Sequence, residues 1–268
     1  MGIMSTGAIY KGFIIGKEGE PGRLNSTNYG VYITGEGVYD TPERDDEMVY
    51  IPGRNGALYR NKGTFKNIEV TYHCGMVGDA QTDFASGISA FRNALLLRDD
   101  IYLPLYDDYN TDEYRMAVYR RGLEVTPVAY GQAGEFDITF ECKPQRFLKS
   151  GDTEQTVSTS GALFTNPTGW NALPIIKFKM TGTSGTITLG DNGECGVITI
   201  NGAPLNTEII VDCEVGEAYT GYVGHPTASM NQYVDLGAKI PYLGGGSVRF
   251  TFTSNITNIK VRPRWWRI

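Results

Sequence analysis

Alternating apolar and polar positions run through much of the chain and predict short β-strands. Residues 66–74 show the alternation most clearly, with Ile68, Val70 and Tyr72 on one side of an extended segment and polar side chains on the other. The other strand-like segments of the first half are residues 8–15, 29–35, 56–65, 101–108, 113–125 and 134–143. We therefore expect this half to form a sheet.

One segment of the first half has helical periodicity. Residues 82–98 carry apolar side chains at intervals of three or four residues, and Asp79 or Thr82 is expected to cap the helix at its N-terminus. Gly87 stands in the middle, where glycine costs roughly 1 kcal/mol relative to alanine, and it indicates close packing against a sheet. The apolar stripe consists of Phe84, Ile88, Phe91 and Leu95.

The second half consists of strand-like segments at intervals of roughly ten residues. It opens with residues 148–161, which are polar and free of aromatics and predict a linker or a first edge strand. The strand-like segments are residues 174–182, 185–190, 196–202, 207–216, 247–254 and 256–266. Because no helical pattern interrupts them, they indicate a β-sandwich. We expect a mainly β protein with two domains, residues 1–148 (a β-barrel or sheet with one α-helix) and residues 149–268 (the sandwich).

The composition supports a folded, strand-rich protein. Of the 268 residues, 41% are hydrophobic, which is enough for a sizeable core, and 34 glycines and 12 prolines suit tight turns between short strands. The formal net charge of −6 argues against a protein whose main task is to hold nucleic acid, because such binding depends on neutralising phosphates with lysine and arginine.

The sequence predicts neither membrane insertion nor a zinc site. Its N-terminal stretch lacks a basic leader and a long apolar block, so a protein made in a cytoplasm is expected. The four cysteines, Cys74, Cys142, Cys195 and Cys213, show no C-x-x-C spacing and are accompanied by only two histidines. We expect buried free thiols.

Candidate catalytic and metal-binding motifs fail on their spacing. Adjacent aspartates on a strand point to opposite faces, so the Asp-Asp pairs indicate solvated turns rather than the two carboxylates of a glycosidase. Residues 107–113 match the start of a calcium loop but lack its glycine and its final glutamate. Neither His73 nor His225 has a G-x-S-x-G motif to serve, and no phosphate-binding glycine loop is present. We expect no catalytic residue, metal or cofactor, and no enzyme activity.

Several strings form a distinctive series along the chain. In the first half these are YIPGRNGALYRNKGTFKNIEVTY, then one helix, then LPLYDDYNTDEYRMAVYRRG and GEFDITFECKPQRFL. In the second half they are NPTGWNALPIIKF, GVITINGA, EIIVDCEVGEAY and IKVRPRWW. Together they cover nearly the whole chain and resemble the Dit family, the distal tail proteins of long-tailed phages.

The resemblance implies a structural virion protein at the distal end of a siphophage tail. Family members form a ring of six copies, with N-terminal domains around a channel and galectin-like C-terminal sandwiches outside. One face of the ring meets the tail-tube protein and the other the tail-associated hub protein, and the periphery can carry receptor-binding proteins. DNA is expected to pass through the channel without specific binding, in keeping with the acidic net charge.

A ring also needs head-to-tail contacts between copies, which favour aromatic anchors and arginines. The first sixty residues are rich in both. The expected interface turn consists of Pro52, Gly53, Arg54, Asn55 and Gly56. Arg54 offers a planar fork to a carboxylate or carbonyl of a neighbour, and a simple surface salt bridge is the alternative.

The junction between the domains is the second expected site. It consists of Lys143, Pro144, Gln145, Arg146 and Phe147. Pro144 has no N–H to donate and is expected to end the ladder of the last strand, after which the following residues fix the exit toward the second domain. Replacing Pro144 and Arg146 is expected to loosen the angle between the domains, which small-angle scattering measures.

A carbohydrate-binding module that contributes to host-surface adhesion is the main alternative function. Galectin-like sandwiches can stack sugars on aromatic rings, and the candidates are Trp170, Tyr219, Tyr222 and Tyr233. Aromatic residues of a sandwich more commonly belong to its core. A glycan array on the second half and a mass measurement of the whole chain distinguish the two interpretations.

Overall fold

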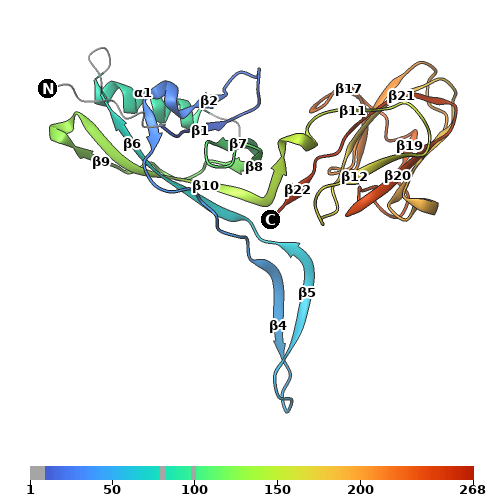
Figure 1. The fold of residues 1–268 in the computed structure, drawn as a ribbon, viewed down its shortest axis with the longest axis horizontal. Helices are drawn as coiled ribbons and strands as arrows, with labels where there is room; N and C mark the ends of the chain where they lie inside the picture. The colour runs from blue at the N-terminus through green and yellow to red at the C-terminus, as the bar shows by residue number, and fades with distance from the viewer. Residues whose placement is uncertain (1–9, 79–82, 98–100) are drawn as a thin grey trace. The chain divides into compact units, whose positions relative to one another are not determined.

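The computed structural model describes residues 10–78, 83–97 and 101–268 (Figure 1). The chain divides into two compact units, residues 1–146 together with Ile268, and residues 147–267. Each unit has its own hydrophobic core. The described residues are mainly β with a single α-helix, so the expected fold class is confirmed.

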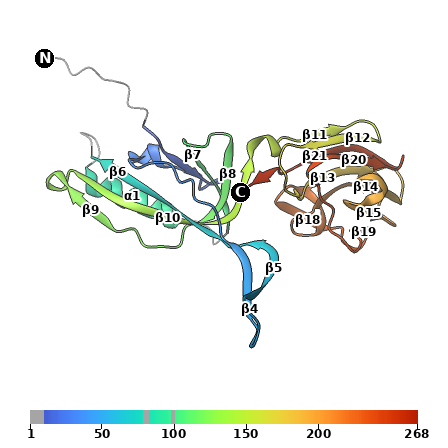
Figure 2. The ribbon, with the colours of Figure 1, turned by 60° about the horizontal axis from the view of Figure 1, so that its bottom comes forward.

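The first unit is built on one curled antiparallel sheet (Figures 1 and 2). Its strand order is β2-β1-β7-β8-β10-β6-β3, and β9 also pairs with β10. The strands are β1 (Phe13–Ile15), β2 (Leu24–Asn25), β3 (Val31–Ile33), β6 (Ile68–Val77), β7 (Leu103–Asp107), β8 (Glu113–Val118), β9 (Val125–Val128) and β10 (Ala133–Leu148). Two short 3-10 helices, η1 (Ser26–Tyr29) and η2 (Ala129–Gly131), precede β3 and β10. The segment expected as one strand over residues 113–125 is thus divided between β8 and β9.

Helix α1 (Phe84–Leu96) packs against this sheet and confirms the expected helix. Its apolar stripe of Phe84, Ile88, Phe91 and Leu95 is buried, and Gly87 is buried with it. The N-cap is Asp83, whose carboxylate accepts a hydrogen bond from the Ser86 N–H at 2.8 Å. The expected caps, Asp79 and Thr82, lie outside the described residues, and that expectation is wrong because Asp83 is the residue directly before the first helical turn.

The pairing of β6 with β10 forms the centre of the core. Ten consecutive residue pairs join the two strands, from Ala133↔Val77 to Cys142↔Ile68. On the buried face, Phe13 of β1, Tyr72 of β6 and Phe140 of β10 bring their rings together with centroids 5.4–6.2 Å apart. Such aromatic contacts add to the free energy already gained by removing the rings from water.

Strand β10 continues through Pro144 to Leu148, so the expectation that Pro144 ends it is wrong. Pairing with β6 ends at Cys142, two residues before the proline. The missing N–H of Pro144 therefore removes no hydrogen bond to β6, and proline is tolerated where a strand has lost that neighbour.

The second unit is a sandwich of two antiparallel sheets. One contains β11 (Gln155–Val157), β21 (Ile256–Arg262), β13 (Ile175–Met180), β16 (Glu208–Asp212), β17 (Glu217–Tyr222) and β18 (His225–Ser229), in that order. The other contains β12 (Ala162–Asn166), β20 (Gly246–Phe252), β14 (Gly185–Leu189), β15 (Gly196–Ile200) and β19 (Val234–Asp235). The short helices η3 (Lys149–Gly151) and η4 (Asp191–Gly193) and strand β22 (Trp266–Arg267) complete the unit. Because β11 is the first edge strand, the second of the two interpretations of residues 148–161 is correct.

Arg264 holds the C-terminal end of the sandwich together. Its guanidinium donates to the Leu173 carbonyl at 2.7 Å and to both carboxylate oxygens of Asp212 at 2.8 and 3.3 Å. Glu214 lies 3.3 Å away as a second anion. The Arg264 side chain is only 12% exposed, so these charge-assisted hydrogen bonds replace the water that it has lost.

All four cysteines are free and buried, as expected. Burial raises the pKa of the Cys74, Cys142 and Cys213 thiols to about 12. None of the helices in the described part of the chain has the length and apolar content of a membrane span.

These three thiols are expected to resist alkylation in the native protein. At about pH 8, a thiol whose pKa lies so far above the free value of about 8.5 has very little of the reactive thiolate, and burial also excludes the reagent. Mass spectrometry after iodoacetamide treatment should find Cys74, Cys142 and Cys213 unmodified, whereas the same treatment in guanidinium chloride modifies them. Rapid labelling without denaturant would contradict the buried placement.

Candidate functional site: an exposed hairpin and a charged pocket

Strands β4 (Arg44–Tyr50) and β5 (Ala57–Phe65) form a two-stranded hairpin that extends away from the sheet of the first unit (Figures 1 and 2). Every residue of the two strands is exposed or half-buried. An isolated two-stranded hairpin is marginally stable in water, because two strands alone have nothing to pack a hydrophobic face against. This hairpin is therefore the part of the first unit that most needs a partner.

One face of the hairpin carries large apolar side chains. Met48 lies opposite Tyr59, and Tyr50, two residues along, lies on the same face. These three residues, which we call the aromatic face, are 57%, 46% and 79% exposed. The opposite face combines Val49 and Leu58 with the ion pair of Glu47 and Arg60. An exposed apolar cluster of this kind marks an interaction surface.

The expected interface turn lies at the tip of this hairpin. Residues 52–56 connect β4 to β5, and every residue of the turn is exposed. Gly53 and Gly56 have φ of 78° and 80°, a region that favours glycine, so the sequence fits the turn. Arg54 makes no ion pair with any residue that the structure describes, which disfavours the simple salt bridge and leaves its guanidinium available.

The expected junction residues occupy the last part of β10. The Lys143 ammonium lies 5.5 Å from the centre of the Tyr102 ring. Arg146 donates to the Ile268 carbonyl at 2.8 Å and lies 3.5 Å from Glu113. Phe147 is buried in the second unit. That Pro144 and its neighbours, among them Gln145, fix the exit from the first domain stays a prediction.

The candidate sugar-stacking residues do not form one platform. Trp170 stacks on Trp266, with ring centroids 5.0 Å apart and planes inclined by 24°. Tyr219 is 6% exposed and packs in a small apolar cluster, and Tyr233 packs against the sandwich core. Tyr222, at 78% exposed, is the member of the four that offers an open ring. That these four residues bind a sugar stays a prediction.

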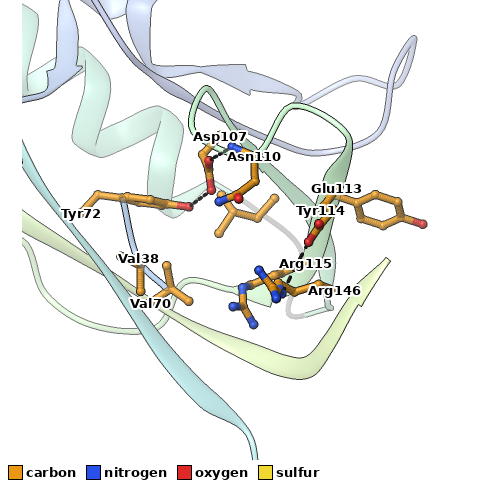
Figure 3. Close-up of a pocket in the computed structure, with 10 residues that line it drawn as sticks. Val38, Val70, Tyr72, Asp107, Asn110, Glu113, Tyr114, Arg115 and Arg146 are labelled. Carbon is orange, nitrogen blue, oxygen red and sulfur yellow. Dashed lines mark hydrogen bonds and ion pairs between the residues drawn. The ribbon is translucent and has the colours of Figure 1, made fainter. Parts of the chain in front are cut away.

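A small pocket with charged walls lies within the first unit (Figure 3). The polar side chains that line it are Tyr72, Asp107, Asn110, Glu113, Arg115 and Arg146, and Val38, Val70 and Leu105 contribute apolar walls. The sequence did not single out this group, because its members come from four separate segments and share no motif. The buried carboxylate and guanidinium in β8 nevertheless alternate with half-buried residues, which is an unusual pattern for the core face of a strand.

Hydrogen bonds within the pocket fix Asp107. Its carboxylate accepts from the Tyr72 hydroxyl at 2.8 Å and from the backbone N–H groups of Tyr109 and Asn110, each at 2.9 Å. Burial, with Asp107 adding to it, raises the pKa of Tyr72 well above its ordinary value. The neutral phenol is thus the form that donates to Asp107.

The charges of the pocket also act on Arg115. Burial lowers the pKa of its guanidinium below the ordinary value, and the neighbouring Arg146 lowers it further, whereas Cys142, Tyr72 and Asp107 raise it. Arg115 is 8% exposed and Glu113 is 4% exposed. The cluster therefore balances the buried Glu113 and Arg115 and the half-buried Asp107 and Arg146, and nothing in it presents a nucleophile beside a base.

Comparison with solved structures identifies the architecture. The crystal structure of the Dit protein (gp 19.1) of phage SPP1, described as a paradigm of the hub adsorption apparatus in phages that infect Gram-positive bacteria, superimposes with a TM-score of 0.65 at 14% identity, over 93% of this chain and 98% of that one. The chain has the Dit fold. The resemblance found in the sequence is confirmed at the level of fold.

Chains of the phage p2 baseplate have the same fold. In its activated conformation with Sr, the match has a TM-score of 0.54 at 11% identity and covers 94% of this chain and 96% of that one. With Ca, the TM-score is 0.53 at 10% identity, with the same coverage. No family model and no curated protein matches the sequence. The Dit fold spans both units of the chain, and the identities are too low for the comparison to establish more than the fold.

The hydrogen bond from Tyr72 to Asp107 is expected to stabilise the first unit measurably. Because the Tyr72 side chain is buried and its acceptor is a carboxylate, Tyr72→Phe should lower the free energy of unfolding by about 1.5–3 kcal/mol. All three tryptophans lie in residues 147–267, so circular dichroism should report the loss while tryptophan fluorescence follows the second unit.

Tyr222→Phe is the matched control for this measurement. It removes the same hydroxyl from an exposed ring and should change stability by less than about 0.5 kcal/mol. Equal effects of the two substitutions would refute the role given to the Tyr72 hydrogen bond.

Proposed function

We propose that this Dit-fold protein is a structural component of a phage tail, in which six copies form a ring at the distal end. The ring joins the tail-tube protein on one face to the tail-associated hub protein on the other, and its periphery is a site for a receptor-binding protein. The fold shared with the SPP1 and p2 proteins supports the tail assignment. The first unit is the ring-forming domain, and the sandwich is the outer domain.

The exposed hairpin is the main observation in favour of a ring. A closed ring requires a head-to-tail contact, in which one patch of each copy meets a different patch of the next. The hairpin provides a projecting patch with an aromatic face and a tip that holds an available arginine. Aromatic residues and arginine are the types enriched at the buried centres of protein interfaces.

The polar face of β6 and β10 suits a protein through which DNA passes. Its carboxylates belong to Glu69, Glu135, Asp137 and Glu141. Arg121 pairs with Glu69, and Arg120 lies 2.6 Å from Glu141. Lys143, two residues after Glu141 in β10, is a third cation, so four carboxylates face three positive charges. A bore built from such surfaces has no excess of positive charge with which to hold phosphates and does not retain DNA.

Catalysis is not part of the proposal. In the described residues no group of three or more candidate metal ligands occurs. In the charged pocket Tyr72 donates to Asp107, and Arg146 lies at ion-pair distance from Glu113, so the described side chains do not form an acid, a base and a nucleophile in reach of a substrate. Assembly, rather than chemistry, is the activity that the hairpin and the shared fold support.

Charged substitutions on the aromatic face are expected to dissolve the ring. The wild-type chain should show a species of about 177 kDa in mass photometry, which is six copies of 29.5 kDa. Met48→Asp combined with Tyr50→Asp would bury two carboxylates in the contact and should leave monomers, because an unpaired charge in an interface costs several kcal/mol.

Tyr222→Asp provides the control, since that ring is 78% exposed against 79% for Tyr50 but lies on the second unit. It should preserve the ring. The proposal is wrong if the hairpin variant still forms rings while its circular dichroism shows a folded chain, or if micrographs of the native particle place the chain away from the tail tip.

A further inference from the structure

Two guanidinium donors face the charged pocket without a hydrogen-bond acceptor. Among the residues that the structure describes, neither Nη1 of Arg115 nor Nε of Arg146 has a hydrogen-bond partner. Figure 3 shows both guanidinium groups at the same side of the pocket. Arg115 is more than nine-tenths buried, so bulk water does not solvate it.

Leaving such donors unsatisfied is costly. A buried polar group without a partner loses the free energy that water gave it, and native structures pair the great majority of such groups with protein or with ordered water. Glu113 lies 3.5 Å from Nε of Arg146, which is an ion-pair distance rather than a hydrogen bond. An additional hydrogen-bond acceptor near both arginines would satisfy these two donors.

The pocket has room for one small acceptor. The volume open to the centre of a water molecule is about 20 Å³. By the same measure one water needs roughly 10–15 Å³, so a larger ligand such as a sugar or a nucleotide is excluded. A bound water also needs two to four polar partners, and the carboxylate of Asp107 and the amide of Asn110 line the same space as the two donors.

The charge balance selects a neutral acceptor. The guanidinium groups of Arg115 and Arg146 face the carboxylates of Asp107 and Glu113 across the pocket, so their formal charges cancel. A chloride ion would add an uncompensated negative charge beside two carboxylates, whereas water accepts from both donors and gives its own hydrogens to neighbouring oxygens.

We propose that one ordered water occupies this pocket and accepts hydrogen bonds from Nη1 of Arg115 and Nε of Arg146. The water links β8, which carries Arg115, to the end of β10, which carries Arg146, and to the turn after β7. It is thus an integral part of the first unit. This inference is independent of the proposed role in the tail.

A crystal structure of the full chain grown without halide tests the proposal. We expect one solvent peak within hydrogen-bonding distance of both nitrogen atoms. A second crystal soaked in sodium bromide should show no anomalous peak at this position. An empty pocket, a bromide peak, or arginine side chains that turn to protein acceptors would each overturn it.

Arg115→Met provides a second test, because it removes the donor while keeping a long side chain. The crystal structure of this variant should lose the solvent peak or show it displaced toward Arg146. An unchanged peak would mean that Arg115 does not hold the water. If the variant does not fold, the halide-free and bromide-soaked crystals of the wild-type chain still decide the question.

Discussion

The pairing of β6 with β10 is the constraint on which the first unit depends. Ten paired residues fix which side chains of both strands enter the core and which face outward. The inward set, with Tyr72 and Phe140, packs under α1 and against β1, and the outward set is polar. A slip by one residue would exchange the two sets and place carboxylates in the core, so the alternation in the sequence enforces a single register.

The same sheet also places charged side chains at the edge of the core of the first unit. Strands β6, β7, β8 and β10 together bring a phenol, two carboxylates and two guanidinium groups to the edge of the core. Buried charges of this kind contribute little to stability unless every donor and acceptor is paired. Hydrogen bonds join Asp107 to Tyr72 of β6 and to the turn after β7, and an ion pair places Glu113 of β8 beside Arg146 of β10.

The hairpin of β4 and β5 shows the opposite arrangement, with apolar side chains exposed to water. It leaves Met48, Tyr50 and Tyr59 in water, and its two strands have no third neighbour among the described residues. A globular protein gains nothing from such an element by itself, since the apolar area remains solvated. Exposed apolar side chains are typical of a surface that another molecule covers. The proposed assembly therefore gives a reason for these side chains that folding of the single chain does not.

The sequence predicted those features that depend on local contacts along the chain. Alternation in residues 66–74 and 134–143, the single helix and the regular strands of the second half all followed from spacing along the chain, because periods of two and 3.6 residues report the buried face directly. The family resemblance rested instead on the strings themselves. The charged run at the start of β4 obscured that strand, since Asp45, Asp46 and Glu47 disfavour strands on propensity and are stabilised there by cross-strand partners.

The tertiary structure decided what depended on distant neighbours. Only the fold shows that Pro144 lies beyond the last pair with β6, so that the strand continues through it. Only the fold gathers Tyr72, Asp107, Arg115 and Arg146 into one pocket, and separates Tyr219 from Tyr222 into buried and exposed environments. The sequence by itself determined the elements and their faces; which faces meet, and which remain uncovered, depended on long-range pairing that a local pattern does not encode.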